Sequence, residues 1–170
     1  MTRRWVAWVA VAVAVLVQLT WAPRWGIFGA RPDLVTLVAV SLAFLDGPQT
    51  GAVSGFLGGL ALDALGLGAV GVGALSRAIA GFSAGLVERN VFGKSVLMPM
   101  LAVGAATFVA QLCELVLLLL LGRSVPVFAS VFGIIIPSAV YNGVLAGAVY
   151  PLLALAGQRE RGRPQLEQLG

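Results

Sequence analysis

Hydrophobic residues run through almost the whole chain, from Trp5 to Gly157, and no polar stretch of real length interrupts them. Of all residues, 59% are hydrophobic and 11% are charged, whereas soluble domains carry charge on about a quarter of their positions. Several of the apolar runs meet or approach the ~20 residues that cross a bilayer core as a helix. The sequence therefore predicts an all-α membrane protein that crosses the bilayer several times.

Six helices fit the apolar runs best. Turns containing proline, glycine or aspartate separate the runs, and Pro137 is expected to kink the last one. The predicted helices span residues 5–21, 33–45, 50–65, 70–87, 95–121 and 128–156. We expect one compact transmembrane bundle over residues 1–157 and a polar, basic cytoplasmic tail over residues 158–170.

An even number of spans places both ends of the chain on the same side of the membrane. The positive-inside rule assigns that side to the cytoplasm, because more arginine and lysine then lies inside than outside. With cytoplasmic ends, the inside holds Arg3, Arg4, Arg89, Lys94, Arg159, Arg161 and Arg163, and the outside holds Arg24, Arg31 and Arg123. We therefore expect a cytoplasmic N-terminus and a cytoplasmic C-terminus.

The second and third predicted helices are short for membrane spans. At 1.5 Å per residue, residues 33–45 cover roughly 20 Å and residues 50–65 roughly 24 Å, whereas the hydrocarbon core is ~30 Å thick. Such segments either thin the bilayer locally or lie inside the protein, away from lipid. The sequence leaves both explanations open.

Composition argues against catalysis. The chain contains no histidine, which is the commonest general base and metal ligand, and its single cysteine, Cys113, lies in an apolar run. The acidic residues are scattered one to a segment, so they form neither a paired-carboxylate site nor a metal motif. Basic clusters at the two ends suit topology signals and lipid contacts rather than nucleic acid. The sequence therefore predicts no enzyme, no cofactor, no metal and no nucleic-acid partner.

Besides Asp33 at the start of the second helix, three charged residues fall within the predicted helices, where an unpaired charge is costly. Arg77 and Glu114 each lie about seven residues, or roughly 10 Å, from the outer end of their helix. Since their depths are similar and their signs opposite, we expect a structural ion pair between them, with Asp63 as a nearby competitor for the guanidinium. A proton or ion relay is the alternative role. Gln111 and Asn142 are expected to hydrogen-bond across the fifth and sixth helices.

Glycines recur at four-residue spacing along the third helix, at Gly51, Gly55 and Gly59. In lipid this spacing allows two helix backbones to approach closely. One interpretation is that the short hairpin of the second and third helices recognises a partner's transmembrane helix through this face. The other is that the same face packs on the fourth or sixth helix of the same chain.

Four short motifs follow one another along the chain. They are RPDL at residues 31–34, GFLGGLALD at 55–63, GVGAL at 71–75 and IPSAVYN at 136–142. In this order and spacing they resemble the MreD family of rod shape-determining membrane proteins, over roughly residues 5–155. The family-motif positions in this sequence are Pro32, Asp33, Asp63, Pro137 and Asn142.

The resemblance implies a non-enzymatic subunit of the bacterial cell-elongation machinery in the inner membrane. It implies direct binding to MreC, through transmembrane and juxtamembrane groups, and a shared complex with MreB, RodA and a class B penicillin-binding protein. That complex maintains cell shape and lateral peptidoglycan synthesis. Contacts with membrane lipids are expected, and a homodimer is left open.

The resemblance also implies a bundle similar to the substrate-binding subunits of energy-coupling-factor transporters. This likeness supplies an alternative function, the binding of a small, vitamin-type molecule for transport. Such a site needs polar groups that converge on a pocket. The polar groups on offer are Asp33, Asp63, Arg77, Glu114 and Asn142, which are too few and too scattered along the sequence to favour it.

Overall fold

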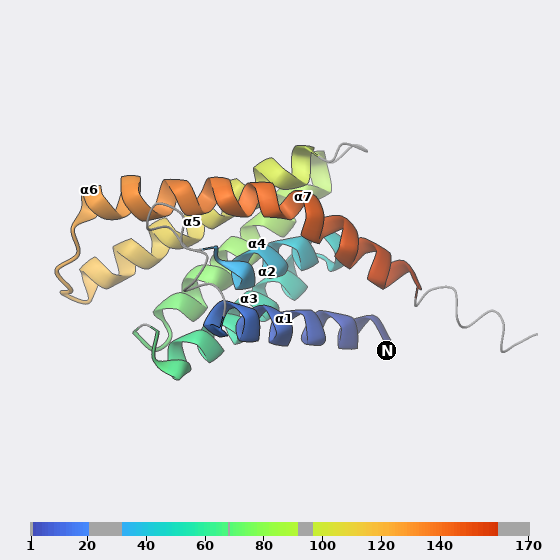
Figure 1. Ribbon diagram of the computed structural model, residues 1–170, viewed down its shortest axis with the longest axis horizontal. Helices are drawn as coiled ribbons and strands as arrows, with labels where there is room; N and C mark the ends of the chain where they lie inside the picture. The colour runs from blue at the N-terminus through green and yellow to red at the C-terminus, as the bar shows by residue number, and fades with distance from the viewer. Residues whose placement is uncertain (1, 21–31, 68, 92–96, 160–170) are drawn as a thin grey trace, which may run out of the picture.

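The structure, a computed structural model, describes residues 2–20, 32–67, 69–91 and 97–159, and every regular element in these ranges is helical. Six helical rods form a bundle, which Figure 1 shows from the side. The elements are α1 (Thr2–Thr20), α2 (Leu34–Asp46), α3 (Pro48–Leu62), the π-helical turn η2 (Asp63–Leu67), α4 (Val72–Val91), α5 (Leu97–Leu120), α6 (Val127–Ser130), the π-helical turn η3 (Val131–Ile135) and α7 (Ile136–Arg159). The last three are successive parts of one rod.

The all-helical fold is confirmed, and the number of rods equals the number of predicted helices. Two helical stretches, Leu97–Leu120 and Val127–Ala156, are long and apolar enough to cross a membrane by themselves. The crossing of the membrane by all six rods stays a prediction. The predicted polar tail lies outside the described residues from residue 160 onward.

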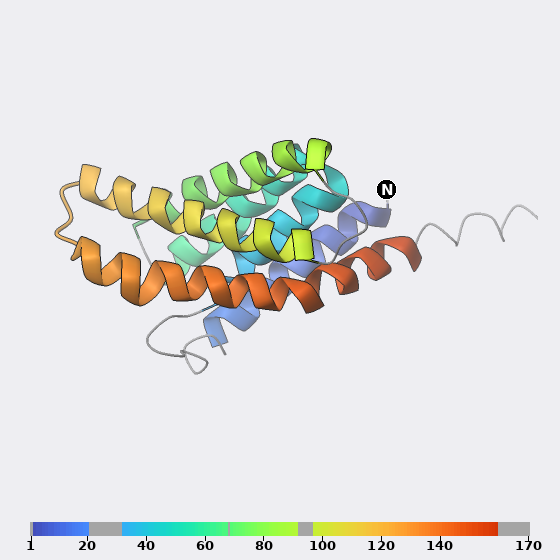
Figure 2. The same ribbon diagram turned by 90° about the horizontal axis from the view of Figure 1, so that it is seen from above.

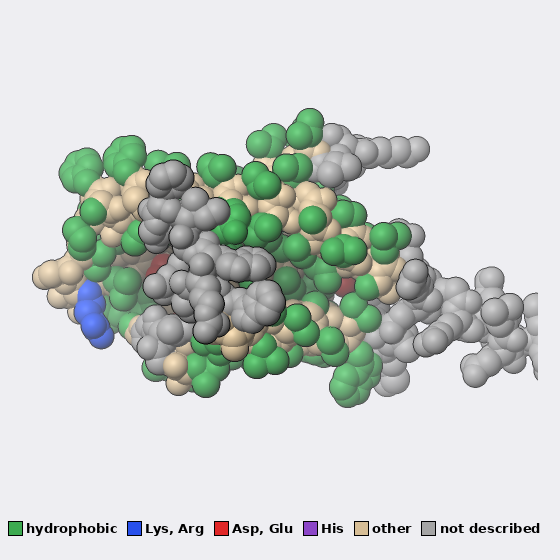
Figure 3. All heavy atoms as spheres, in the orientation of Figure 1, with side chains coloured by type: hydrophobic (Ala, Val, Ile, Leu, Met, Phe, Trp, Pro, Cys, Tyr) green, Lys and Arg blue, Asp and Glu red, His purple; other side chains and the backbone are tan. Residues whose placement is uncertain are grey.

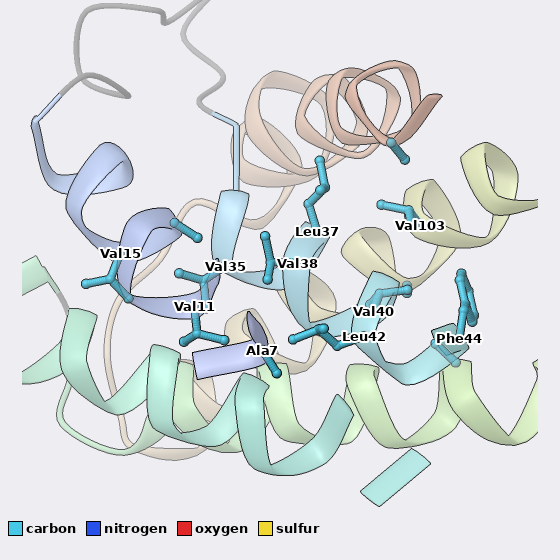
Figure 4. Packing of buried hydrophobic residues seen from close by; sticks show 14 of the residues in the cluster. Ala7, Val11, Val15, Val35, Leu37, Val38, Val40, Leu42, Phe44 and Val103 are labelled. Atoms are coloured by element: carbon cyan, nitrogen blue, oxygen red, sulfur yellow. The ribbon is translucent and has the colours of Figure 1, made fainter. Parts of the chain in front are cut away.

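Helix α2 occupies the centre of the bundle. It contacts α1, α3, α4, α5 and α7, and every residue from Val35 to Phe44 is buried. In Figure 4, Val11 and Val15 of α1 and Val103 of α5 lie around the side chains of α2. Because protein surrounds α2 on all sides, its 13 residues do not have to match the bilayer thickness. Of the two explanations for the short helices, burial inside the protein holds for α2.

Local sequence signals set the ends of α2. Asp33 caps its N-terminus, because the Asp33 carboxylate accepts a hydrogen bond from the Thr36 peptide N–H. Gly47 ends the helix with a φ of 95°, a conformation that strains any residue with a Cβ. Pro48 then opens α3 at the first helical position, where no N–H is needed. The single residue between α2 and α3 therefore makes a tight hairpin.

The outer surface is as apolar as the interior. Large hydrophobic side chains on α1, α3, α4, α5 and α7 are exposed, among them Leu16, Leu57, Phe82, Leu101 and Val144. Figure 3 shows hydrophobic side chains spread over the described part of one face, with few charged ones among them. Such a surface suits hydrocarbon lipid rather than water.

The rod that contains α7 adapts to its prolines. Proline has no N–H and its ring collides with the carbonyl of the residue four positions earlier in an α-helix. Directly before Pro137, the turn η3 is π-helical, and the Ile136 N–H donates to the carbonyl of Val131, five residues earlier. The π-helical turn thus accommodates Pro137, and the kink expected there stays a prediction. In Figure 1 the rod changes direction in the C-terminal part of α7, which contains Pro151.

The N-terminus of α1 and the C-terminal end of α7 lie at the same end of the bundle in both Figure 1 and Figure 2. An arrangement with both chain ends on one side of a membrane has this geometry. The orientation, with both ends in the cytoplasm, stays a prediction.

Candidate functional site

A network of polar side chains lies inside the bundle, and Asp33 is at its centre. Asp33 is 4% exposed. Its Oδ1 accepts a hydrogen bond from the Thr36 N–H at 3.1 Å, and its Oδ2 accepts one from Thr36 Oγ1 at 2.8 Å. The Gln18 side chain of α1 joins the network, because its Oε1 accepts from the Val35 N–H at 3.0 Å and its Nε2 lies 3.4 Å from Asp33 Oδ1. The N-cap of α2 thus also ties α1 to α2.

Arg77, on α4, points its buried guanidinium at Asp33. Nη2 lies 3.1 Å from Asp33 Oδ2 and Nε lies 3.4 Å from Oδ1, which is a two-point contact. Nη1 lies 3.6 Å from Glu114 Oε2 of α5. The structure therefore brings together Arg77 and Glu114, the residues expected to pair, but places Asp33 closer. The sequence interpretation overlooked Asp33 as a partner of Arg77, because Asp33 stands at the first position of its predicted helix, whereas Arg77 and Glu114 lie about seven residues inside theirs.

Asp63 is buried where α3 passes into η2, and its role differs from the expected one. Its Oδ2 accepts hydrogen bonds from the peptide N–H groups of Gly71, at 2.9 Å, and Ala74, at 3.2 Å. These amides lie at the start of α4, whose positive dipole end favours a carboxylate. Within the described ranges no ion pair joins Asp63 to Arg77. Asp63 therefore caps α4. It also acts electrostatically on the Arg77 guanidinium, and its competition with Glu114 for that group stays a prediction.

Asn142, on α7, is fully buried and connects three helices. Its Nδ2 donates to the Asp33 carbonyl at 2.9 Å and to Thr107 Oγ1 of α5 at 3.0 Å. Its Oδ1 accepts from the Asp33 N–H at 3.1 Å. Gln111, expected to act similarly, instead has a buried Oε1 with no hydrogen-bond partner among the described residues.

Thr107 was missed from the sequence, although a signal for it existed. Thr107, Gln111 and Glu114 follow one another at intervals of four and three residues on an otherwise apolar helix. This spacing places the three on one face of α5.

The two prolines among the family-motif positions lie at the edges of the network. Pro32 is buried next to Asp33, and Pro137 is half-buried at the start of α7.

The glycine stripe of α3 packs on α4 of the same chain. A Cβ added to Gly55 would lie 2.5 Å from the Arg77 carbonyl oxygen, and one added to Gly59 would lie 2.6 Å from Ala74 Cα. A Cβ on Gly51 would lie 2.7 Å from the carbonyl oxygen of Gly81. No atom fits between these backbones, so no partner helix can pack there. The interpretation of Gly51, Gly55 and Gly59 as a partner-docking face is wrong.

A cavity of about 540 Å³ lies beside the network. Its polar lining includes Gln18, Asp33, Arg77, Gln111 and Glu114, and its apolar lining comes from α5 and from the rod of α6, η3 and α7. Among the described residues, no three side chains of the metal-ligating types gather at one place. The arrangement can hold helices together and bind a polar group, but it presents no nucleophile activated by a base.

A family model for the rod shape-determining protein MreD matches residues 1–158 of the chain. The chain belongs to the MreD family. MreD proteins are membrane proteins that determine rod shape, and the family belongs to the rod-shape complex that includes MreC. No curated protein and no solved structure matches the chain significantly. The alternative function in a vitamin transporter is not supported, and the likeness to energy-coupling-factor subunits stays a prediction.

Proposed function

We propose that this MreD-family chain is a non-enzymatic, multi-pass subunit of the cell-elongation complex in the bacterial inner membrane. It binds MreC directly and acts in a common assembly with MreB, RodA and a class B penicillin-binding protein during lateral peptidoglycan synthesis. The observation that carries this proposal is the family match over residues 1–158. The expected test is co-purification of MreC with the tagged full-length chain, together with restoration of rod shape in cells that lack their own MreD.

The polar network supports a structural role. Both oxygens of the Asp33 carboxylate, both ends of the Asn142 amide and two nitrogens of the Arg77 guanidinium are engaged within the chain. Groups held in this way fix the positions of α2, α4, α5 and α7 relative to one another. They are poorly placed to react with a substrate.

A groove between α5 and α7 suits a single transmembrane helix of MreC. The groove has a volume of about 420 Å³, and Gly104, Ala105 and Gly143 give it a low floor between exposed side chains such as Leu101 and Val140. Small residues let a second helix approach closely in lipid. The groove lies on the two helical stretches that are long enough to cross a membrane, so a spanning helix could follow it through the bilayer.

Filling the groove tests this site. Ala105 is exposed in the groove, so Ala105→Phe should fold and should reduce the amount of co-purified MreC by about tenfold. Ala129→Phe is the matched control, because Ala129 is exposed on α6 outside the groove. If Ala105→Phe retains as much MreC as the control, MreC binds another face. If the parent chain retains no MreC, direct binding itself is wrong.

Reporter fusions test the proposed topology. Fusions after Arg24, Glu88 and Gly157 should report the outside, the inside and the inside, because six spans with cytoplasmic ends place those positions there. A fusion after Gly157 that reports the outside contradicts this topology.

A further inference from the structure

Two hydrogen-bond acceptors in the cavity beside the polar network are not fully satisfied by donors from the described residues. Gln111 Oε1 is buried and has no donor among the described residues. Glu114 has only the 3.6 Å contact with Arg77, and its side chain is 32% exposed. Both residues line the cavity, and they lie three positions apart on the same face of α5. A buried acceptor without a donor is costly, so the pair favours an occupant that supplies N–H or O–H groups.

The charges around the cavity favour a cation. Arg77 and Asp33 neutralise each other through their two-point contact. The Asp63 carboxylate is stabilised by two peptide N–H groups at the start of α4. Among the described residues around the cavity, Glu114 is then the carboxylate whose nearest cation, Arg77 Nη1 at 3.6 Å, belongs to a guanidinium that already binds Asp33. An occupant that donates hydrogen bonds and carries positive charge satisfies both Gln111 and Glu114.

The chemistry of the lining favours an organic cation over a metal ion. Calcium needs six to eight oxygen ligands, whereas the cavity offers one free carboxylate and one amide oxygen. A primary ammonium is compact and carries three donors. Beyond the polar end, Leu115, Leu118 and Ile134 provide an apolar wall suited to an alkyl chain. The volume of about 540 Å³ lies within the range of roughly 300–1,000 Å³ typical of small-molecule sites.

We propose that this cavity binds the primary ammonium group of an amphipathic molecule, with the nitrogen donating to Gln111 Oε1 and to the Glu114 carboxylate. The molecule is either a free alkylamine or an aminophospholipid such as phosphatidylethanolamine, since both carry this head group. The site does not depend on the proposed function in cell elongation, because it uses the part of α5 from Gln111 to Leu118, whereas the groove assigned to MreC uses the part from Met100 to Phe108.

Thermal unfolding of the purified full-length chain in detergent tests the ammonium site. At about 100 times its Kd, n-octylammonium should raise the unfolding temperature by about 5 °C or more. Octyltrimethylammonium, which has the charge but no N–H donor, and octanol, which lacks the charge, should raise it much less. Equal stabilisation by all three probes contradicts the proposal.

Two variants locate the site. Glu114→Gln should weaken octylammonium binding by about tenfold or more, and Gln111→Leu by about threefold to tenfold, because each removes one acceptor. Arg123→Gln is the control, since it removes an exposed charge in the turn after α5 and should leave binding unchanged. If both cavity variants bind octylammonium as well as the parent does, the ammonium lies elsewhere and the proposal is wrong.

Vesicles distinguish the two sources of the ammonium group. We compare vesicles of phosphatidylethanolamine and phosphatidylglycerol with vesicles in which phosphatidylcholine replaces phosphatidylethanolamine. If the unfolding temperature is higher in the vesicles that contain phosphatidylethanolamine, and if Glu114→Gln removes this difference, the lipid is the occupant. Equal temperatures combined with stabilisation by octylammonium identify a free amine. If neither probe stabilises the chain, the cavity does not bind an ammonium group.

Discussion

Helices α3 and α4 meet backbone to backbone, whereas α5 and α7 leave more space between them, although both pairs use glycines. A Cβ added to Gly55 or Gly59 of α3 would lie 2.5–2.6 Å from atoms of the α4 backbone. A Cβ added to Gly104 of α5 would lie 3.1 Å from the Ala139 carbonyl oxygen, and one added to Gly143 of α7 would lie 3.0 Å from the Met100 carbonyl oxygen. Glycine spacing is thus shared by a closed interface and a looser one.

The two regions also differ in how their polar groups are satisfied. On the α3–α4 side, Asp63 is held by peptide N–H groups, and the glycine stripe is covered. On the α5–α7 side, a cavity and an apolar groove remain, and Gln111 lacks a donor. The α3–α4 region is therefore closely packed, and the α5–α7 region carries the cavity and the groove considered above for binding.

The largest effect is expected from Arg77, which connects the two regions. Arg77→Leu leaves the buried Asp33 carboxylate without its cation and should lower the free energy of unfolding by about 3–5 kcal/mol. Glu114→Leu should lower it by about 1 kcal/mol or less, because Glu114 lies 3.6 Å from Arg77 and is partly exposed. Denaturation in mixed micelles measures the free energy of unfolding of both variants. Equal losses in the two variants would mean that Glu114, rather than Asp33, is the main partner of Arg77.

Matched glycine substitutions test the difference in packing directly. Gly55→Ala forces a methyl group against the Arg77 carbonyl oxygen and should lower the free energy of unfolding by about 2–3 kcal/mol. The Cβ of Gly104→Ala would lie 3.1 Å from the Ala139 carbonyl oxygen, and alanine has a higher helix propensity than glycine. The free energy of unfolding of this variant should therefore stay within about 1 kcal/mol of that of the parent. The same denaturation experiment serves for both. If the two variants lose equal stability, the α3–α4 interface is not the tighter one.

Much of the fold could be predicted from the sequence, because runs of apolar residues and turn residues set the helices. Residues 33–45 were expected to form the second helix, and α2 covers Leu34–Asp46. The pairing of charges was harder to predict, because the estimate of depth assumed that each helix starts at a membrane surface. Since α2 lies inside the bundle, Asp33 is brought to Arg77. Sequence order gives the position of a charge along its helix but not the displacement of one helix against another.

The glycine stripe shows a second limit of the same kind. The spacing of Gly51, Gly55 and Gly59 predicted a close helix contact, and such a contact exists. The neighbour was undetermined, since a helix of the same chain and a helix of a partner need the same small residues. The unsatisfied oxygen of Gln111 had no sequence signal either, because satisfaction of a polar group depends on every surrounding helix.

A medium effect is expected from Asn142, which fastens α7 to α2 and α5 in the open region. Asn142→Ala leaves the buried Asp33 N–H without its partner and removes one of the two hydrogen bonds to the Asp33 carbonyl, which keeps the Leu37 N–H, so it should lower the free energy of unfolding by about 2 kcal/mol. Thr107→Val is the control, because it removes the Asn142–Thr107 hydrogen bond and the one that the Thr107 hydroxyl donates to the Val103 carbonyl but leaves the contacts of Asn142 with Asp33 in place, so it should have about half that effect. If Asn142→Ala unfolds no more easily than Thr107→Val, the contacts with the Asp33 backbone contribute little.

The smallest effect, and one of opposite sign, is expected from Gln111. Gln111→Leu removes a buried acceptor that has no donor among the described residues, so the free energy of unfolding in detergent should stay unchanged or rise by up to about 1 kcal/mol. Gln18→Leu is the matched control, because the Gln18 amide bonds to the Val35 N–H and to Asp33, and its loss should lower stability by about 1–2 kcal/mol. Octylammonium should stabilise the parent and the Gln18 variant more than the Gln111 variant. A loss of stability in Gln111→Leu as large as in Gln18→Leu, with no added amine, would show that Gln111 already has a donor within the folded chain.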